Sequence, residues 1–257
     1  MTEDELILTH ILQCSRSELY LRNFKLTDSQ QKQFVSYQLR RKAGEPLQYI
    51  LGVCDFMGIE LTVDQRALIP RPETEVLVDE AIKRIKNLHS PKILDLGTGS
   101  GNIAIALLKF IEESFVTTVD VSKEALDLAK DNAFKHELEG RITFVQADMR
   151  DFLAQDKQQY DLIISNPPYI PINQMKTLPV DVLQEPLLAL EAGEAGLDFY
   201  IDIIKLTPPL LRRKAYLMME FGDGQEKAIK ELSQDQFKYI QIIKDLTDRN
   251  RIIILRR

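Results

Sequence analysis

Asn166, Pro167, Pro168 and Tyr169 follow an apolar run, residues 160–165, that predicts a strand. The Asn166 side-chain oxygen and the Pro167 carbonyl can each accept one N–H, Pro168 has no N–H to compete, and Tyr169 offers a flat face. Such a set suits a planar nitrogen whose lone pair is delocalised, because two acceptors draw it toward tetrahedral geometry. The chemistry then depends on positioning and needs no strong base. An isolated Asn-Pro-Pro can also be a turn that ends a strand.

A glycine-rich turn stands between a predicted strand and a predicted helix. In open α/β sheets ligands bind at this turn, where glycine lets a ligand lie on the main chain. The G-x-G-x-G spacing differs from the G-x-G-x-x-G of dinucleotide sites, and Asp95 just before it would repel a diphosphate but can face the cationic end of S-adenosylmethionine. A tight turn without a ligand is the alternative. The residues expected to bind this cofactor are Gly97, Thr98, Gly99, Ser100 and Gly101.

Two carboxylates close later predicted strands. Asp120 ends the strand after the glycine turn, where an acid can bind both ribose hydroxyls. Asp148 ends the next strand and can accept a hydrogen bond from an adenine amino group. Each could be an ordinary turn residue, but together, at one edge of the sheet, they support the cofactor interpretation.

The elements that position these residues alternate between strands and helices from residue 72 onward, which predicts an α/β fold with a parallel sheet covered on both faces. Strands are expected at residues 92–96, 115–121, 142–146, 160–165, 215–221, 239–246 and 251–255. Helices are expected at residues 102–110, 122–134, 197–213 and 225–232, with a further one starting at Pro72. Residues 170–194 are proline-broken yet apolar, which predicts a folded loop over the site.

The first fifty residues predict helices, one around Leu6 to Leu12 and one at residues 29–42. Extended runs at residues 56–63 and 67–69, separated by residues 64–66, predict a hairpin. We therefore expect three parts: a helical substrate-recognition domain (1–50), a β-hairpin linker (51–71) and a catalytic domain (72–257).

Composition narrows the class of protein. The 257-residue chain has a formal net charge of −6, which weighs against a nucleic-acid partner. Cys14 and Cys54 form no motif, and His10, His89 and His136 lack partners at zinc spacing, so no metal is expected. The acidic N-terminus and the lack of a long apolar run predict a protein of the cytoplasm, without membrane contact. We expect a monomer.

Five ordered segments resemble the release-factor glutamine methyltransferase family, a group of class I S-adenosylmethionine-dependent methyltransferases. They are residues 46–52 (PLQYILG), 68–75 (LIPRPETE), 95–101 (DLGTGSG), 166–170 (NPPYI) and 196–200 (GLDFY). The resemblance implies a class I, Rossmann-like fold with a seven-stranded, mostly parallel sheet and a small N-terminal helical domain. It also implies transfer of a methyl group to the glutamine N5 of the Gly-Gly-Gln motif in class 1 peptide chain release factors.

The resemblance also implies roles for residues. Asp148 and Met149 would contact the adenine, Asn166 to Tyr169 would bind the glutamine with Asn166 also reaching the cofactor, and Arg71 and Glu73 would lie near the mouth of the site. For Arg71 and Glu73, helix capping or surface ion pairing is an equal alternative. Two departures are the short N-terminal domain and methionine at position 149, where members often carry an aromatic.

The sequence is compatible with two other functions. An adenine N6 methyltransferase acting on DNA or RNA would use the same Asn-Pro-Pro-Tyr motif, but it would need a basic groove or a target-recognition region. A binding module that has lost its chemistry would be expected to lose Asn166 or the glycines, and both are present.

Overall fold

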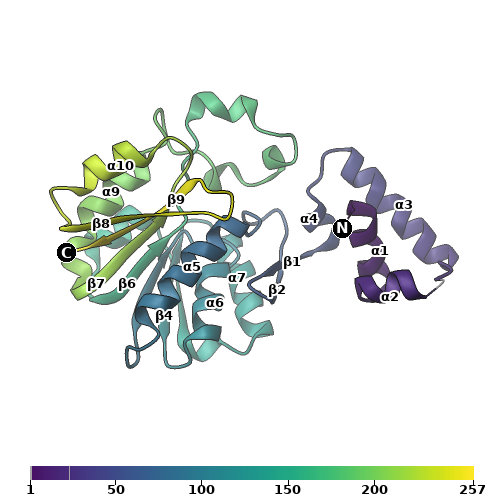
Figure 1. Ribbon diagram of the computed structural model, residues 1–257, viewed down its shortest axis with the longest axis horizontal. Coiled ribbons are helices and arrows are strands. Elements are labelled where there is room, and N and C mark those ends of the chain that lie inside the picture. Colours follow the sequence, from purple (N-terminus) through teal and green to yellow (C-terminus); the bar gives the residue numbers. More distant parts are fainter. Residues whose placement is uncertain (1, 23) are drawn as a thin grey trace.

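The computed structural model describes residues 2–22 and 24–257, and its N-terminal helices stand apart from a larger α/β body (Figure 1). The N-terminal helices are α1 (Glu3–Leu12), α2 (Arg16–Leu21), α3 (Asp28–Lys42) and α4 (Leu47–Leu51). Each of the first three begins with a capping box, in which a Ser or Thr and a Glu or Gln three residues on satisfy each other's main-chain N–H. The predicted helix at 29–42 is confirmed.

A two-stranded hairpin follows, made of β1 (Val53–Phe56) and β2 (Ile59–Thr62). Its turn is Met57-Gly58, with φ of 54° and 77°, which is the two-residue turn whose twist matches a hairpin. The predicted hairpin centred on residues 64–66 is therefore wrong.

Residues 64–66 form a turn of another kind. The Asp64 carboxylate accepts the main-chain N–H of Arg66 at 3.0 Å and binds its guanidinium, so the turn is held by a side chain and not by paired strands. Residues 67–69 belong to no strand, although Ala67 and Ile69 are buried. The hydroxyl of Tyr49 on α4 donates to the Ala67 carbonyl at 2.7 Å and joins the helical part to this segment.

The larger body contains a seven-stranded sheet in the order β5-β4-β3-β6-β7-β9-β8, parallel except for β9. Its strands are β3 (Lys92–Leu96), β4 (Phe115–Asp120), β5 (Ile142–Gln146), β6 (Tyr160–Ser165), β7 (Leu211–Glu220), β8 (Tyr239–Lys244) and β9 (Asn250–Arg256). The order reverses between β3 and β6, and ligands bind at such a reversal in open α/β sheets. The expected seven-stranded class I methyltransferase fold is confirmed.

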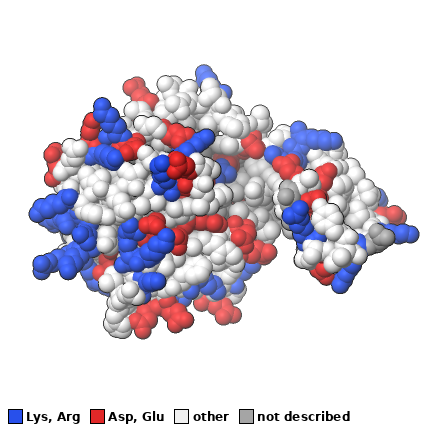
Figure 2. All heavy atoms as spheres, in the orientation of Figure 1, with Lys and Arg blue, Asp and Glu red and all other residues white. Residues whose placement is uncertain are grey.

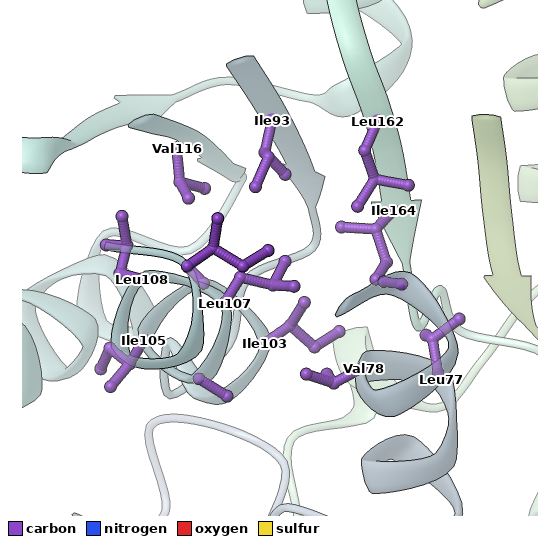
Figure 3. Close-up of a cluster of buried hydrophobic side chains, with 14 of the residues drawn as sticks. Leu77, Val78, Ile93, Ile103, Ile105, Leu107, Leu108, Val116, Leu162 and Ile164 are labelled. Carbon is purple, nitrogen blue, oxygen red and sulfur yellow. The ribbon is translucent and has the colours of Figure 1, made fainter. Parts of the chain in front are cut away.

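Helices cover both faces of this sheet (Figure 1). One face carries α5 (Pro72–Ile85), α6 (Asn102–Phe110) and α7 (Lys123–Lys135), and the other carries α8 (Met149–Gln155), α9 (Asp198–Leu206) and α10 (Glu226–Ser233). Side chains alternate along each strand, so that Ile93 packs under α5 and α6 while Leu94 packs under the opposite helices. Figure 3 shows the hydrophobic core between the sheet and helices α5, α6 and α7, where Leu77 and Val78 of α5 face Ile164 of β6.

Two helix predictions need correction. The expected helix at 197–213 ends at Leu206, because Pro208 and Pro209 cannot continue it, and β7 begins at Leu211. Helix α8 was not predicted at all. The loop at 170–194 is folded as expected, with three short 3₁₀ turns and a bridge between Ile170 and Glu191.

Candidate active site

Two cavities open at the carboxyl ends of β3, β4 and β6, and both are lined by Asn166. The first, which we call the cofactor cavity, has a volume of about 240 Å³ and is bounded by the glycine turn, the end of β4 and the start of α8. The second, which we call the acceptor cavity, has a volume of about 310 Å³ and includes Tyr169, Glu220 and part of the 170–194 loop. Asn166 therefore stands where a molecule in one cavity would meet a molecule in the other.

The glycine turn lines the cofactor cavity with Gly97, Thr98, Gly99 and Ser100. Gly97 and Gly99 have φ of 72° and 54°, a backbone region that a residue with a side chain rarely adopts. Gly101 is not among the residues that line the cavity. A Cβ there would approach the Cβ of Ala129 on α7 to 3.2 Å, so a glycine permits close packing between α6 and α7. The cofactor contact expected of Gly101 stays a prediction.

Asp95 lies fully buried beneath the turn. Its Oδ2 accepts a hydrogen bond from the Thr98 hydroxyl at 2.7 Å, while Oδ1 has no partner among the described residues. Burial raises the pKa of this carboxyl to about 7. Ser100 Oγ is the other fully buried side-chain oxygen that lacks a hydrogen-bond partner among the described residues. Ser100 lines the cofactor cavity, whereas Asp95 lies beneath the wall and is not part of it. Each of these unmet oxygens can accept a further hydrogen bond.

Asp120, at the end of β4, also lines the cofactor cavity. One carboxylate oxygen accepts the Gly99 N–H and the other accepts the Ser122 N–H, each at 2.9 Å. Burial raises the pKa of Asp120, and these main-chain bonds oppose the rise. Since each carboxylate oxygen can accept more than one hydrogen bond, both retain capacity for a ligand hydroxyl.

The expected adenine contacts lie on the wall beyond Asp120. Asp148 caps α8, and its carboxylate is bound to the Arg150 guanidinium at 2.6 Å, which lowers the Asp148 pKa. Met149 lines the same wall, and its Cε would lie 3.4 Å from a Cβ placed at Gly97. The Arg150 guanidinium also lies 5.5 Å from the ring centre of Phe199, a cavity residue that we did not predict.

The NH₂ end of the Asn166 side chain is hydrogen-bonded within the protein, and its oxygen is not. Its Nδ2 donates to the Thr74 hydroxyl at 3.1 Å, and the Thr74 hydroxyl donates to Glu220 Oε2 at 2.6 Å. Among the described residues no N–H or O–H donates to Asn166 Oδ1 or to the Pro167 carbonyl. The two acceptors predicted for the target nitrogen are thus both unoccupied by protein donors.

The rest of the motif divides between the cavities. Pro168 lines the cofactor cavity and Tyr169 the acceptor cavity, while Pro167 is buried and lines neither cavity. Gln225 fixes the Tyr169 main chain by donating to its carbonyl at 3.0 Å. Gly222 is needed beside the ring, because a Cβ there would lie 2.9 Å from Tyr169 Cδ2.

Charged side chains surround the acceptor cavity. Arg71 and Glu73, both predicted near the mouth, line it together with Glu220 and Arg251. Arg71 pairs with the buried Glu185 of the loop, whose other oxygen accepts the Ile69 N–H at 2.9 Å. Arg71 is therefore part of a wall contact between α5 and the loop, and its side chain does not cap α5.

Several residues of this site escaped the sequence analysis. Thr74 stands inside the segment 68–75 that was singled out, but was given no role. Glu220 ends the apolar strand β7, as Asp120 ends β4, and a carboxylate at that position was the available signal. No sequence pattern pointed to Glu185 or Gln225.

Two further features bear on the class of site. No three His, Cys, Asp or Glu side chains gather as metal ligands within residues 2–22 and 24–257. Of the helices in this part of the chain, none combines the length and apolarity required to cross a bilayer.

The fold is shared with solved methyltransferases. The catalytic domain of hMettl16 in complex with an MAT2A 3′UTR hairpin superposes with a TM-score of 0.63 at 16% identity, covering 90% of this chain and 82% of that one. A methyltransferase from Pyrococcus furiosus gives a TM-score of 0.58 at 16% identity, covering 89% and 98%. At this level of identity the likeness concerns the fold alone.

Sequence comparison is more specific. Residues 73–188 match the methyltransferase small domain family, and residues 2–52 match the PrmC N-terminal domain family. The release factor glutamine methyltransferase of Chlorobaculum tepidum is 39% identical, covering 96% of this chain and 87% of the relative. That of Bacillus cereus is 34% identical, covering 97% and 90%. The chain therefore belongs to the release factor glutamine methyltransferase family.

Proposed function

We propose that this protein transfers a methyl group from S-adenosylmethionine to the side-chain amide nitrogen of the glutamine in the Gly-Gly-Gln motif of class 1 peptide chain release factors. The observation that carries the proposal is the position of Asn166 between the two cavities, with its side-chain oxygen and the Pro167 carbonyl free of protein donors. A primary amide has two N–H groups, and these two acceptors match them.

The cofactor cavity supplies the groups that S-adenosylmethionine requires. The glycine turn would receive its amino-acid end, with the buried Asp95 carboxylate beneath the turn favouring the positive charge, and Asp120 would accept its ribose hydroxyls. Met149 and neighbouring apolar wall residues would contact the adenine. Asp148, while paired with Arg150, would accept a hydrogen bond from the adenine amino group. S-adenosylmethionine, when bound, supplies an electrophilic methyl group.

The acceptor cavity orients the nucleophile. Asn166 and Pro167 would accept the two amide hydrogens and weaken the conjugation of the nitrogen with its carbonyl. Pro168, without an N–H, leaves that pattern undisturbed, and Tyr169 would cover the planar group. Arg71, which lines both cavities, would contact the substrate. Catalysis would come from orientation, which can contribute about 7–11 kcal/mol where reacting groups are well placed.

The N-terminal helices are proposed to recognise the protein substrate and not to catalyse. They line neither the cofactor cavity nor the acceptor cavity, yet α4 is bonded to the segment that does, through Tyr49 and Ala67. We keep the proposed division into a helical domain (1–50), a linker (51–71) and a catalytic domain (72–257). A monomer in the reducing cytoplasm fits the unpaired Cys14 and Cys54.

Direct nucleic-acid binding is not part of the proposal. On the face drawn in Figure 2, Lys and Arg gather at the end of the molecule near the C-terminus, while Asp and Glu are frequent across the middle. Within the described chain the acceptor cavity carries the acids Glu73 and Glu220 beside its two arginines, which does not favour a phosphate backbone.

A direct assay tests the proposal. The protein is incubated with methyl-labelled S-adenosylmethionine and, separately, a class 1 release factor, the same factor with its Gly-Gly-Gln glutamine replaced by alanine, and duplex DNA. We expect label in the unmodified factor alone. Label in DNA but not in the factor would overturn the assignment.

A further inference from the structure

The side chain of Asn166 is hydrogen-bonded to Thr74, which in turn is hydrogen-bonded to Glu220, and these two buried residues come from distant parts of the chain. Thr74 lies in the first turn of α5 and Glu220 at the end of β7, and both are 1% exposed. The hydrogen bonds run from Asn166 Nδ2 to Thr74 Oγ1 and from that hydroxyl to Glu220 Oε2. Thr74 and Glu220 are separated by 146 residues, so that only the folded protein brings them together.

The direction of this chain of bonds is set by its last member. An ionised carboxylate accepts hydrogen bonds and donates none, so the Thr74 hydroxyl must give its only hydrogen to Glu220. The Thr74 oxygen can then only accept from Asn166, and the group that meets it must be the NH₂ end of the amide. Rotation of the amide by half a turn would place Asn166 Oδ1 against the lone pairs of Thr74.

We propose that Glu220, acting through Thr74, is a positioning residue that holds the oxygen of Asn166 toward the acceptor amide. This inference rests on the proposed function, because it names what keeps the acceptor of that reaction in place. We call the two hydrogen bonds from Asn166 to Thr74 and from Thr74 to Glu220 the relay. Without the relay the Asn166 amide can present either its oxygen or its NH₂ group to the substrate. An NH₂ group facing the target would repel its N–H groups.

Burial, together with the charge of Glu73 on α5, raises the pKa of the Glu220 carboxyl to about 7. The Thr74 bond, Arg251 and Arg71 oppose the rise, and the ionised carboxylate that orients the Thr74 hydroxyl is the main form above about pH 7. The hydroxyl of Tyr200 on α9 donates to the main-chain oxygen of Glu220 at 2.9 Å, which anchors the backbone at that point. The carboxylate is thus held by its strand and directed at Thr74.

The test compares two substitutions that separate the hydroxyl from the shape of Thr74. Thr74→Val keeps the branched shape without the hydroxyl, and Thr74→Ser keeps the hydroxyl. We expect Thr74→Val to lower kcat with a release factor about tenfold, the cost of one lost polar contact, when S-adenosylmethionine is saturating. Thr74→Ser should restore most of the turnover, to within about threefold of the parent. Equal turnover of the valine variant and the parent would overturn the relay.

A matched control removes a buried hydroxyl elsewhere. Thr207 is fully buried and donates to the Ile203 carbonyl at 2.7 Å, away from both cavities. Thr207→Val should lower the midpoint of thermal unfolding as Thr74→Val does, but leave kcat unchanged. If both variants lower kcat alike, the loss follows from stability and the relay is wrong.

A double substitution shows whether Thr74 acts through Asn166. In the Asn166→Ala background there is no amide left to orient, so adding Thr74→Val should reduce kcat by less than about twofold. A further tenfold loss in that background would contradict the mechanism.

A readout independent of turnover separates this inference from the proposed function. The side-chain amide protons of Asn166, assigned by comparison with Asn166→Asp, should exchange slowly with water in the parent and in Thr74→Ser, and faster in Thr74→Val. Slow exchange in all three would overturn the relay even if the release factor is methylated. Failure to methylate any release factor, with the exchange pattern as expected, would overturn the proposed function alone.

Discussion

The carboxylate of Asp120 accepts a hydrogen bond from the main-chain N–H of Gly99 at 2.9 Å, which joins the end of β4 to the turn after β3. Two parts of the cofactor site, predicted from separate stretches of sequence, are thus fixed to each other. The second oxygen of Asp120 accepts from Ser122, so the same side chain also orders the start of α7.

Asp120→Ala should weaken the binding of S-adenosylmethionine. The substitution removes a charged acceptor for the ribose, whose hydrogen bonds typically contribute about 1.5–3 kcal/mol, and frees the Gly99 turn as well. Isothermal titration calorimetry with the cofactor measures the loss. Asp127→Ala on the exposed side of α7 is the control and should bind like the parent. Unchanged affinity in Asp120→Ala would remove Asp120 from the site.

Asn166→Ala should be the most damaging polar substitution for turnover. It leaves one amide hydrogen of the target without an acceptor, and loss of one preorganised polar group typically costs about 10²–10³ in kcat. Asn166→Asp keeps an acceptor oxygen but lacks the N–H that Thr74 accepts, so its kcat should lie between those of alanine and the parent. Parent-like turnover of both variants at saturating cofactor would refute the role of Asn166.

Stability should depend on pH through Glu220. Burial raises the pKa of this carboxyl from 4.5 to about 7, against the opposing influence of the Thr74 bond and Arg251. Folding therefore favours the protonated acid, and the associated stability is present below pH 4.5 and lost as the pH rises through 7. The side chain of Glu220→Gln does not titrate. The free energy of unfolding of this variant, relative to that of the parent, should therefore rise by up to about 3 kcal/mol between pH 5 and pH 8.

Urea unfolding of the cofactor-free protein at several pH values measures that difference. Asp95, whose pKa is also raised to about 7, contributes equally to both proteins and cancels. A difference that stays constant with pH would show that Glu220 titrates in the folded protein as it does in the unfolded chain.

Much of the α/β body could be predicted from the sequence, because each of its long elements carries its own signal. Leu77, Val78, Ala81 and Ile85 recur at helical spacing and are all buried on α5. Helix α8 lacked such a signal, since it has only seven residues and its cap, Asp148, was interpreted as a ligand contact. The hairpin was misplaced because Met57 occupies a positive-φ position without being a typical turn residue.

The candidate site divides in the same way. Local motifs gave the glycine turn and Asn166, whose function depends on residues next to each other in sequence. The contact between Thr74 and Glu220 could not be predicted, since it depends on how α5 lies against β7. The same holds for Arg71 and Glu185, 114 residues apart.

The ion pair of Arg71 and Glu185 should stabilise the wall of the acceptor cavity. Glu185 is 4% exposed, so Arg71→Met leaves a buried carboxylate without its cation. Glu185→Gln keeps an acceptor for the Ile69 N–H while removing the charge. In a double-mutant cycle of urea unfolding, Arg71→Met should cost about 1–2 kcal/mol more in the parent than in the Glu185→Gln background. A coupling near zero would show that the pair adds no stability.

The proposed recognition of the release factor by residues 1–50 can be tested without deleting them. Leu21 on α2 and Leu39 on α3 are 83% and 61% exposed, and a partner that covers them would bury apolar surface. Glutamine at both positions preserves helix propensity and removes that surface. We expect the KM for an intact release factor to rise about tenfold or more, since a buried leucine side chain contributes about 1.5–3 kcal/mol.

The same double variant should act normally on a short Gly-Gly-Gln peptide, because Leu21 and Leu39 line neither the cofactor cavity nor the acceptor cavity. Leu88→Gln is the matched control: Leu88 is 45% exposed between α5 and β3, at the amino ends of the parallel strands and so at the edge of the sheet opposite both cavities, and its loss should alter neither KM. Selective loss on the intact factor supports docking by the N-terminal helices. Equal loss on the factor and the peptide would mean that these side chains act through the fold of the site, and the recognition role would be wrong.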